Sequence, residues 1–230
     1  MRGGGEGRSP ALTANAANPR RAAAVDRPPN QSQPIPPRES AVLLALYERD
    51  DAVQVLFIKR TDRVGLHKGE IGFPGGRIEP DDRDALAAAL REAEEEVGIL
   101  SEAVTPLGAL PLVETIVTNM IIFPFVGCLD APPLLIPSEF EVAETIEVPL
   151  PTLLDPATYH EEDWIIRGVK RRIFVYRYGP YDIWGATGRI VQEFLARLEA
   201  WPERPPIFAW TLDEVAAALA ATAPPASTAL

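Results

Sequence analysis

The sequence contains a short acidic run, REAEEEVG, in which four of five consecutive positions are glutamate: Glu92, Glu94, Glu95 and Glu96. Like charges three or four positions apart on a helix repel each other, each pair by roughly 0.2–0.5 kcal/mol. With about 3.6 residues per turn, Glu92, Glu95 and Glu96 share a helix face, whereas Glu94 is rotated toward solvent. Such a run is commonly a solvated surface, and otherwise a cation must hold the carboxylates together.

The residues around the run favour the cation. Gly75 and Gly76 precede it, and Arg91 stands directly before Glu92, where a guanidinium can brace a carboxylate through two hydrogen bonds. Magnesium binds hard oxygen ligands and commonly combines a few carboxylates with the phosphates of a substrate. The three glutamates that share a face therefore suit divalent cations.

A helix over about residues 84–97 must position these carboxylates. Asp81, Asp82 and Asp84 stand at its start, as the helix dipole favours, and Gly98 ends it. Apolar residues at helical spacing form a second stripe. Its members are Leu86, Leu90, Ala93 and Val97. We expect this stripe to pack inward and the glutamates to lie on the opposite face.

The other elements predict a mixed sheet. Apolar runs at about 40–47 and 53–60 indicate a hairpin around 48–52, followed by a short strand at 71–73 and a turn through the glycines at 74–76. Further strand-like runs lie at 104–113, 119–129, 144–148 and 172–178. A helix at about 187–199 directs four apolar residues inward, and Thr211 with Glu214 has the spacing of a capping box. The four residues are Ile190, Phe194, Leu195 and Leu198. The predicted fold class is α+β, with helices packed on the faces of the sheet.

Composition restricts the partners. The formal charge of −11 and the pI near 4.7 argue against binding of nucleic acid or of an anionic membrane. A small anionic substrate is compatible with this charge if metal ions supply positive charge locally. Cys128 is the single cysteine, so no intrachain disulfide can form and a cytoplasmic location is expected.

The chain divides into three regions. Residues 1–38 are rich in Pro, Gly, Ala and Arg and are predicted to be a disordered tail without a secretory signal. Residues 39–200 form the predicted catalytic domain, and residues 201–230 a peripheral helix and tail. No apolar run reaches the roughly 18–20 residues of a membrane span.

The series from Gly76 to Ile99 resembles the signature of the Nudix hydrolases, G-x5-E-x7-R-E-U-x-E-E-x-G-U, where U is apolar. The second half, Arg91 to Ile99, matches position by position. In the first half Gly76 lies one residue too far from Arg91, and Asp82 stands near the position of the early glutamate.

This resemblance implies an α/β/α sandwich with a mixed sheet between helices. It also implies Mg²⁺ or Mn²⁺ bound by Glu92, Glu95 and Glu96, with the Gly75 carbonyl as a further ligand. The implied reaction is hydrolysis of a nucleoside diphosphate derivative.

A second resemblance concerns the substrate. The stretch LFIKRTDRVGLHKGEIGFPGG (56–76) is similar to a motif of the coenzyme A pyrophosphatase branch, whose bacterial members share the extra residue in the signature. The matching residues are Leu56, Arg60, Gly69, Phe73, Pro74, Gly75 and Gly76. Gly65 replaces a motif arginine, for which Arg63 or Lys68 could substitute, and Thr61 replaces Ser or Ala.

The likeness to this branch covers about residues 40–200. It implies a coenzyme A-like nucleotide substrate, the products 3′,5′-ADP and 4′-phosphopantetheine, and a homodimer. The substrate-binding residues that it implies are Arg60, Gly69, Phe73 and Gly76.

The expected reaction is attack of water on one phosphorus of a pyrophosphate, with metal ions activating the water and neutralising charge on the phosphoryl oxygens. Arg91 belongs to this reaction centre. The general base could be Glu92 or Glu95 within the helix, or Glu141 in FEVAET, which we favour. Glu139 and Glu144 are rivals to Glu141.

Two alternatives stay open at this stage. One is a Nudix hydrolase of ADP-ribose or another nucleoside diphosphate derivative. The other is a non-catalytic Nudix-like module that binds a nucleotide, although such modules usually lose the glutamates retained here. A phosphate-binding loop of the G-x-x-x-x-G-K-[ST] type is absent from the sequence.

Overall fold

The computed structural model describes residues 36–62, 69–115 and 117–223. Most of the predicted N-terminal tail and the end of the C-terminal tail lie outside these residues, as do Arg63, Gly65 and Lys68. Within the described ranges, no helix is both long and apolar enough to cross a membrane.

The described residues form one large mixed sheet and one small antiparallel sheet. The large sheet has the order β3-β2-β1-β7-β5, and β4, β6 and β8 pair with β1, β7 and β2. Its strands are β1 (Arg38–Arg49), β2 (Ala52–Arg60), β3 (Ile71–Gly72), β4 (Gly75–Arg77), β5 (Thr105–Ala109), β6 (Val113–Thr115), β7 (Met120–Cys128) and β8 (Val142–Pro149). The small sheet has the order β11-β10-β9 and consists of β9 (Tyr159–Ile166), β10 (Val169–Tyr178) and β11 (Tyr181–Ile183).

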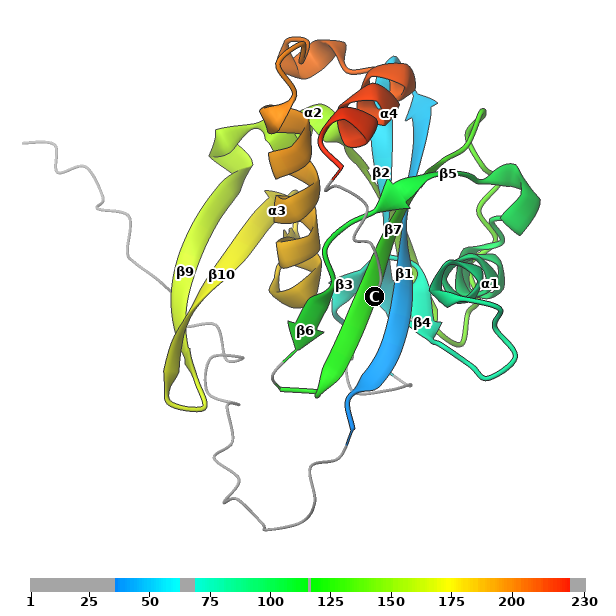
Figure 1. Ribbon diagram of the computed structural model, residues 1–230, viewed down its shortest axis with the longest axis vertical. Helices are drawn as coiled ribbons and strands as arrows, with labels where there is room; N and C mark the ends of the chain where they lie inside the picture. The colour runs from blue at the N-terminus through cyan, green and yellow to red at the C-terminus, as the bar shows by residue number, and fades with distance from the viewer. Residues whose placement is uncertain (1–35, 63–68, 116, 224–230) are drawn as a thin grey trace, which may run out of the picture.

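Helices cover both faces of the large sheet. The α-helices are α1 (Ala85–Val97), α2 (Leu150–Leu154), α3 (Gly185–Ala200) and α4 (Leu212–Ala221). In Figure 1, α1 lies on one side of the sheet, and α3 and α4 lie on the other. Strand β1 contributes to both cores, because Leu44 and Leu46 pack in the core that contains α3 and α4, whereas Leu43 and Ala45 pack in the core beneath α1. The α+β class and the sandwich of a mixed sheet between helices are confirmed.

Strand β1 also organises the candidate site. It pairs along its length with β7 in parallel, and on its other edge it pairs with β2 near its end and with β4 near its start. The β1–β2 hairpin turns tightly, because Arg49 pairs with Ala52 and the two intervening aspartates have φ of 53° and 59°. The predicted hairpin is therefore confirmed, with a shorter turn than expected.

Other predictions need correction in detail. The run at 104–113 divides into β5 and the first residue of β6, and the sequence patterns did not predict β9, β11 or α2. Helix α3 buries the four residues expected to point inward, and Thr211 and Glu214 form the predicted capping box of α4. Helix α4 buries Val215 and Leu219 in the same core as α3.

The ends of α1 follow from its sequence. The Asp84 carboxylate accepts a hydrogen bond from the Ala87 amide at 2.8 Å and so caps the first turn. Gly98 ends the helix with φ of 76°, and its amide donates to the carbonyls of Ala93 and Glu94. These caps set the two ends of the helix that carries the glutamates.

Candidate active site

Glu96 lies at the centre of the candidate site, between α1 and the sheet. Its side chain is 1% exposed, and it accepts hydrogen bonds from the Gly75 amide at 2.9 Å and from Arg60 Nη1 at 3.0 Å. Burial raises the pKa of this carboxyl from 4.5 to about 7, because the loss of water outweighs the two donors. The carboxylates of Glu92 and Glu141 raise this pKa further.

The predicted division of α1 into an acidic face and an opposite apolar face is only partly correct, because Ala93 and Val97 are buried as expected but Glu96 is buried with them. Glu96 is buried beside Ala93 and Val97, whereas Leu86 and Leu90 are only partly buried. The small side chains of Ala88, Ala89 and Ala93 let α1 approach the sheet closely, and that approach encloses Glu96. The structure thus buries Glu96 with the apolar residues from which the carboxylates were expected to be separated.

Glu92 lies over β4. A Cβ atom added to Gly76 would collide with the Glu92 carboxylate, so the glycine provides the space that this side chain fills. Burial is the main cause that raises the pKa of Glu92, while its pairing with Arg91 lowers it. Glu95 and Glu141 also raise the pKa of Glu92, which shows that negative charge gathers around this carboxyl.

Arg91 connects the start of α1 to the carboxylates. Its Nε and Nη2 donate to the two oxygens of Asp82 at 2.9 and 3.1 Å, and its Nη1 donates to Glu92 at 3.1 Å and to Glu95 at 3.3 Å. Nη2 also donates to the Arg77 carbonyl. Hydrogen bonds from Arg91 hold the pKa of Asp82 below its ordinary value. Asp82 therefore fixes the guanidinium that orients two glutamates.

Glu95 differs from its neighbours in exposure. Its side chain is 59% exposed and lies on the outer side of α1 with Arg91. Glu94, which was expected to stay in solvent, is also exposed and accepts hydrogen bonds from the amide and hydroxyl of Ser101. A hollow of about 340 Å³ on this outer side is lined by Arg91, Glu94, Glu95 and Ser101.

Gly75 and Gly76 form a strand, not the predicted turn. The chain bends at Pro74, and β4 then pairs with β1 through Gly75 opposite Val42 and Gly76 opposite Ala41. At Gly75 the backbone has φ of 152°, and a side chain would collide with the Ala41 carbonyl. The glycines are needed because β4 packs closely between β1 and the glutamates of α1, which leaves no room for side chains at these two positions.

Glu141 belongs to the same site, although it lies in a different part of the sequence. Its carboxylate is close enough to raise the pKa of both Glu92 and Glu96. The rival Glu144 accepts a hydrogen bond from the Tyr181 hydroxyl at 2.5 Å and so faces the small sheet. Glu139 is exposed and is not among the groups that shift the pKa of the buried glutamates.

The remaining candidates from the sequence divide into two groups. Arg60 reaches Glu96, and the Gly69 amide donates to the Arg60 carbonyl at 3.1 Å with φ of 64° at Gly69. Phe73, by contrast, lies in the core and stacks on Phe57 with ring centroids 4.8 Å apart. Any role of Phe73 is therefore to hold the segment before β4, because its ring is not available to a substrate.

The donor set suits divalent cations by its chemistry. Glu92 and Glu96 are hard oxygen ligands whose ionised forms are disfavoured by burial and by neighbouring carboxylates, so a cation would supply the missing charge. As the side chains lie, no group of three or more His, Cys, Asp or Glu within the described residues is arranged around a common metal position. Arg60 and Arg91 instead pair with Glu96, Glu92 and Glu95.

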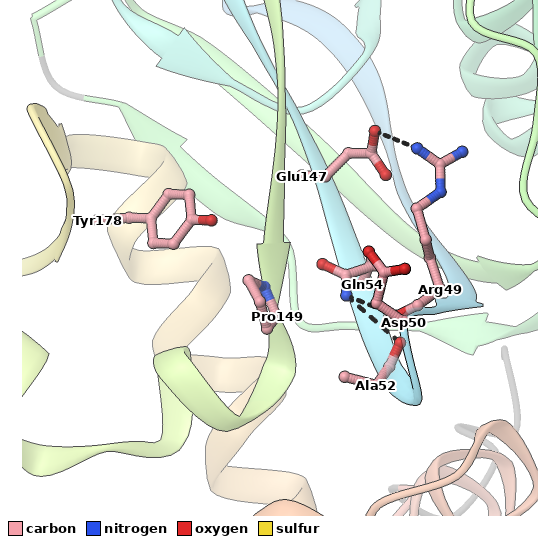
Figure 2. A pocket seen from close by; sticks show the side chains of 7 residues that line it. All are labelled: Arg49, Asp50, Ala52, Gln54, Glu147, Pro149 and Tyr178. Atoms are coloured by element: carbon pink, nitrogen blue, oxygen red, sulfur yellow. Dashed lines mark hydrogen bonds and ion pairs between the residues drawn. The ribbon is translucent and has the colours of Figure 1, made fainter.

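A second pocket, of about 370 Å³, opens beside the turn of the β1–β2 hairpin (Figure 2). It is lined by Arg49, Asp50, Ala52, Gln54, Glu147, Pro149 and Tyr178. Arg49 pairs with Glu147 at 2.7 Å, and the Gln54 amide donates to the Arg49 and Ala52 carbonyls. None of the glutamates of α1 lines this pocket, so it is separate from the carboxylate site.

Gly76→Ala should displace Glu92 and lower turnover by roughly tenfold or more, because small misplacements of reacting groups are costly. The added methyl group would meet the far end of a flexible side chain, so the fold should survive. Gly72→Ala is the matched control, since its Cβ would meet only Thr187 Oγ1 at 3.8 Å. Steady-state rates and circular dichroism of both variants check this, and equal activity of the two would contradict it.

Comparison with known proteins gives the family. A model of the NUDIX domain matches residues 37–167. The Nudix hydrolase NudL of Shigella flexneri is 35% identical over 176 residues, covering 76% of this chain and 91% of that protein. NudL of Enterobacter sp. strain 638 is 37% identical over 165 residues, covering 72% and 85%. A MutT/nudix family protein from Enterococcus faecalis, a solved structure, has a TM-score of 0.49 at 16% identity and covers 86% of this chain and 76% of that one.

The matched region contains the elements that build the carboxylate site, from β1 through α1 to β8. The chain therefore belongs to the Nudix hydrolases, a family of pyrophosphohydrolases that act on nucleoside diphosphate derivatives and generally use divalent metal ions.

Proposed function

We propose that the chain hydrolyses the pyrophosphate bond of coenzyme A or its derivatives, releasing 3′,5′-ADP and 4′-phosphopantetheine. The observation that carries the proposal is the contact between the glutamates of α1 and the stretch 56–76, which resembles the coenzyme A pyrophosphatase motif. Arg60 and Gly75 both donate to Glu96, and Gly76 lies directly beneath Glu92. Residues that resemble the coenzyme A pyrophosphatase motif thus shape the carboxylate site itself.

In this proposal the metal is Mg²⁺ or Mn²⁺, held by Glu92, Glu95 and Glu96 with the Gly75 carbonyl as a further ligand. Bound divalent cations would lower the pKa of a water molecule and neutralise charge on the phosphoryl oxygens. The chain provides buried carboxylates whose charge is only partly balanced by Arg60 and Arg91. Glu95 would be the exposed member of this ligand set.

The protein residues have separate tasks in the reaction. Glu141 would accept a proton from the attacking water, a contribution that is typically about 10²–10⁴-fold for a general base. Its support is the proximity of its carboxylate to Glu92 and Glu96. Arg60 is partly exposed beside Glu96, and its guanidinium would be available to pair with a substrate phosphate.

We further propose a cytoplasmic homodimer. The single cysteine, which cannot form an intrachain disulfide, supports the location. Size-exclusion chromatography with light scattering tests the dimer.

The substrate can be determined by incubating the full chain separately with coenzyme A and with ADP-ribose, each with Mg²⁺ or Mn²⁺. Product masses of 3′,5′-ADP and 4′-phosphopantetheine are expected from coenzyme A. Cleavage of ADP-ribose alone would replace this proposal by the second Nudix activity. Binding of either nucleotide without cleavage would indicate a non-catalytic module.

A further inference from the structure

A short strap, residues 136–142, carries Glu141 and is fastened to α1. The Ile136 amide donates to the Val97 carbonyl and the Ser138 amide to the Glu96 carbonyl, both at 2.9 Å. The Ser138 carbonyl in turn accepts from the amides of Glu141 and Val142. The backbone of the strap is therefore anchored to the turn of α1 that carries Glu96.

The strap has a second anchor at the end of β2. The Thr61 amide donates to the Glu141 carbonyl at 2.9 Å, and the Thr61 hydroxyl donates to the Phe140 carbonyl at 2.8 Å. Thr61 is 8% exposed, so water does not readily replace its hydroxyl. Because threonine is branched at Cβ, its χ1 angle is restricted, and this favours a fixed hydroxyl direction.

Thr61 directly follows Arg60, whose guanidinium donates to Glu96. The pairing of β2 with β8 shifts register between Lys59 and Arg60, which brings Arg60 opposite Val142. Two consecutive residues therefore contact both parts of the site: Arg60 contacts the Glu96 carboxylate on α1, and Thr61 contacts the backbone of the strap beside Glu141.

We propose that Thr61 is a positioning residue, whose hydroxyl sets the position of Glu141 relative to Glu92 and Glu96 by holding the Phe140 carbonyl. This inference rests on the proposed function, because it assigns Thr61 a task in that reaction. Thr61 touches neither reacting atoms nor metal ligands by its side chain and acts only through the strap.

A double-mutant cycle with Glu141 separates positioning from general stability. Thr61→Val keeps the shape of the side chain and removes the hydroxyl, and it should lower kcat by about 2–10-fold, the rate equivalent of one hydrogen bond, with KM changed less than about twofold. Thr61→Ser keeps the hydroxyl and should stay within about twofold of wild type. In the Glu141→Gln background, Thr61→Val should have no further effect.

Three results would overturn the inference. They are full activity of Thr61→Val, equal loss in Thr61→Ser, or an unchanged effect of Thr61→Val when Glu141 is already replaced. Wild-type chain that cleaves none of the nucleotides would instead defeat the proposed function. Amide hydrogen exchange of residues 138–142 then decides on Thr61: faster exchange in Thr61→Val than in Thr61→Ser supports the anchor, and equal exchange overturns it.

Discussion

Glu96→Gln is expected to abolish most metal-dependent hydrolysis while making the metal-free protein more stable above neutral pH. A bound metal ion stabilises transition-state charge by several kcal/mol, so loss of a principal ligand should cost about 10³-fold or more in kcat. The amide keeps the size of the side chain and can still accept from Gly75. Activity and stability should therefore change in opposite directions.

The stability gain follows from the raised pKa of Glu96. Its carboxyl titrates near 4.5 in the unfolded chain and at about 7 in the fold, so between these values the folded state holds the extra proton. The free energy of unfolding must then fall as pH rises from about 4.5 through about 7. Between a pH below 4.5 and pH 8, the free energy of unfolding should therefore fall by about 3 kcal/mol because of this one carboxyl. Glutamine remains neutral and should escape this loss.

Denaturant unfolding in the presence of a chelator, at pH 5 and at pH 8, measures the effect. The gain of Glu96→Gln over wild type should be small at pH 5 and large at pH 8, and Mg²⁺ should stabilise only the wild type. Glu95→Gln should also lose turnover without gaining stability, because Glu95 is largely exposed. Glu94→Gln, on the same helix, should retain activity. A less stable Glu96→Gln at pH 8 would show that Arg60 and Gly75 outweigh burial.

The sequence predicted the parts of the fold that depend on local signals. Two apolar runs with turn-like residues between them identified the β1–β2 hairpin, and the acidic residues before α1 together with Gly98 located this helix within a residue of its observed ends. Strand β9 was missed because the centre of its sequence, YHEEDWII, is polar and none of its residues is fully buried; its pairing with β10 includes cross-strand ion pairs such as Arg172 with Glu161. The sequence of one strand does not show which residues of another strand will pair with it.

The candidate site was predicted in its residues but not in its burial. Helical spacing gave Glu92, Glu95 and Glu96 one face, yet the depth of each depends on how close α1 approaches β4. The small residues Ala89 and Ala93 were the available signal, since they permit that approach. The anchoring role of Thr61 was missed because its partner lies 79 positions away in the chain.

Arg91→Lys is expected to lower kcat or metal affinity by about 10–100-fold, the usual cost of losing a residue that orients metal ligands. Lysine keeps the charge but cannot hold both Asp82 oxygens while reaching Glu92 and Glu95, because only guanidinium presents a planar fork of donors. Asp82→Asn should have a similar but smaller effect, since it frees the guanidinium without removing it.

If Asp82 acts only through Arg91, the double variant should be no worse than Arg91→Lys alone. Titration of Mn²⁺ by electron paramagnetic resonance, together with kcat, distinguishes lost ligand orientation from unfolding. Arg83→Lys is the control, because Arg83 is exposed and pairs only with the neighbouring Asp84 among the described ion pairs. Additive losses from Asp82 and Arg91 would mean that Asp82 contributes to the site by a route other than the guanidinium, and full activity of Arg91→Lys would mean that the glutamates are oriented by the metal itself.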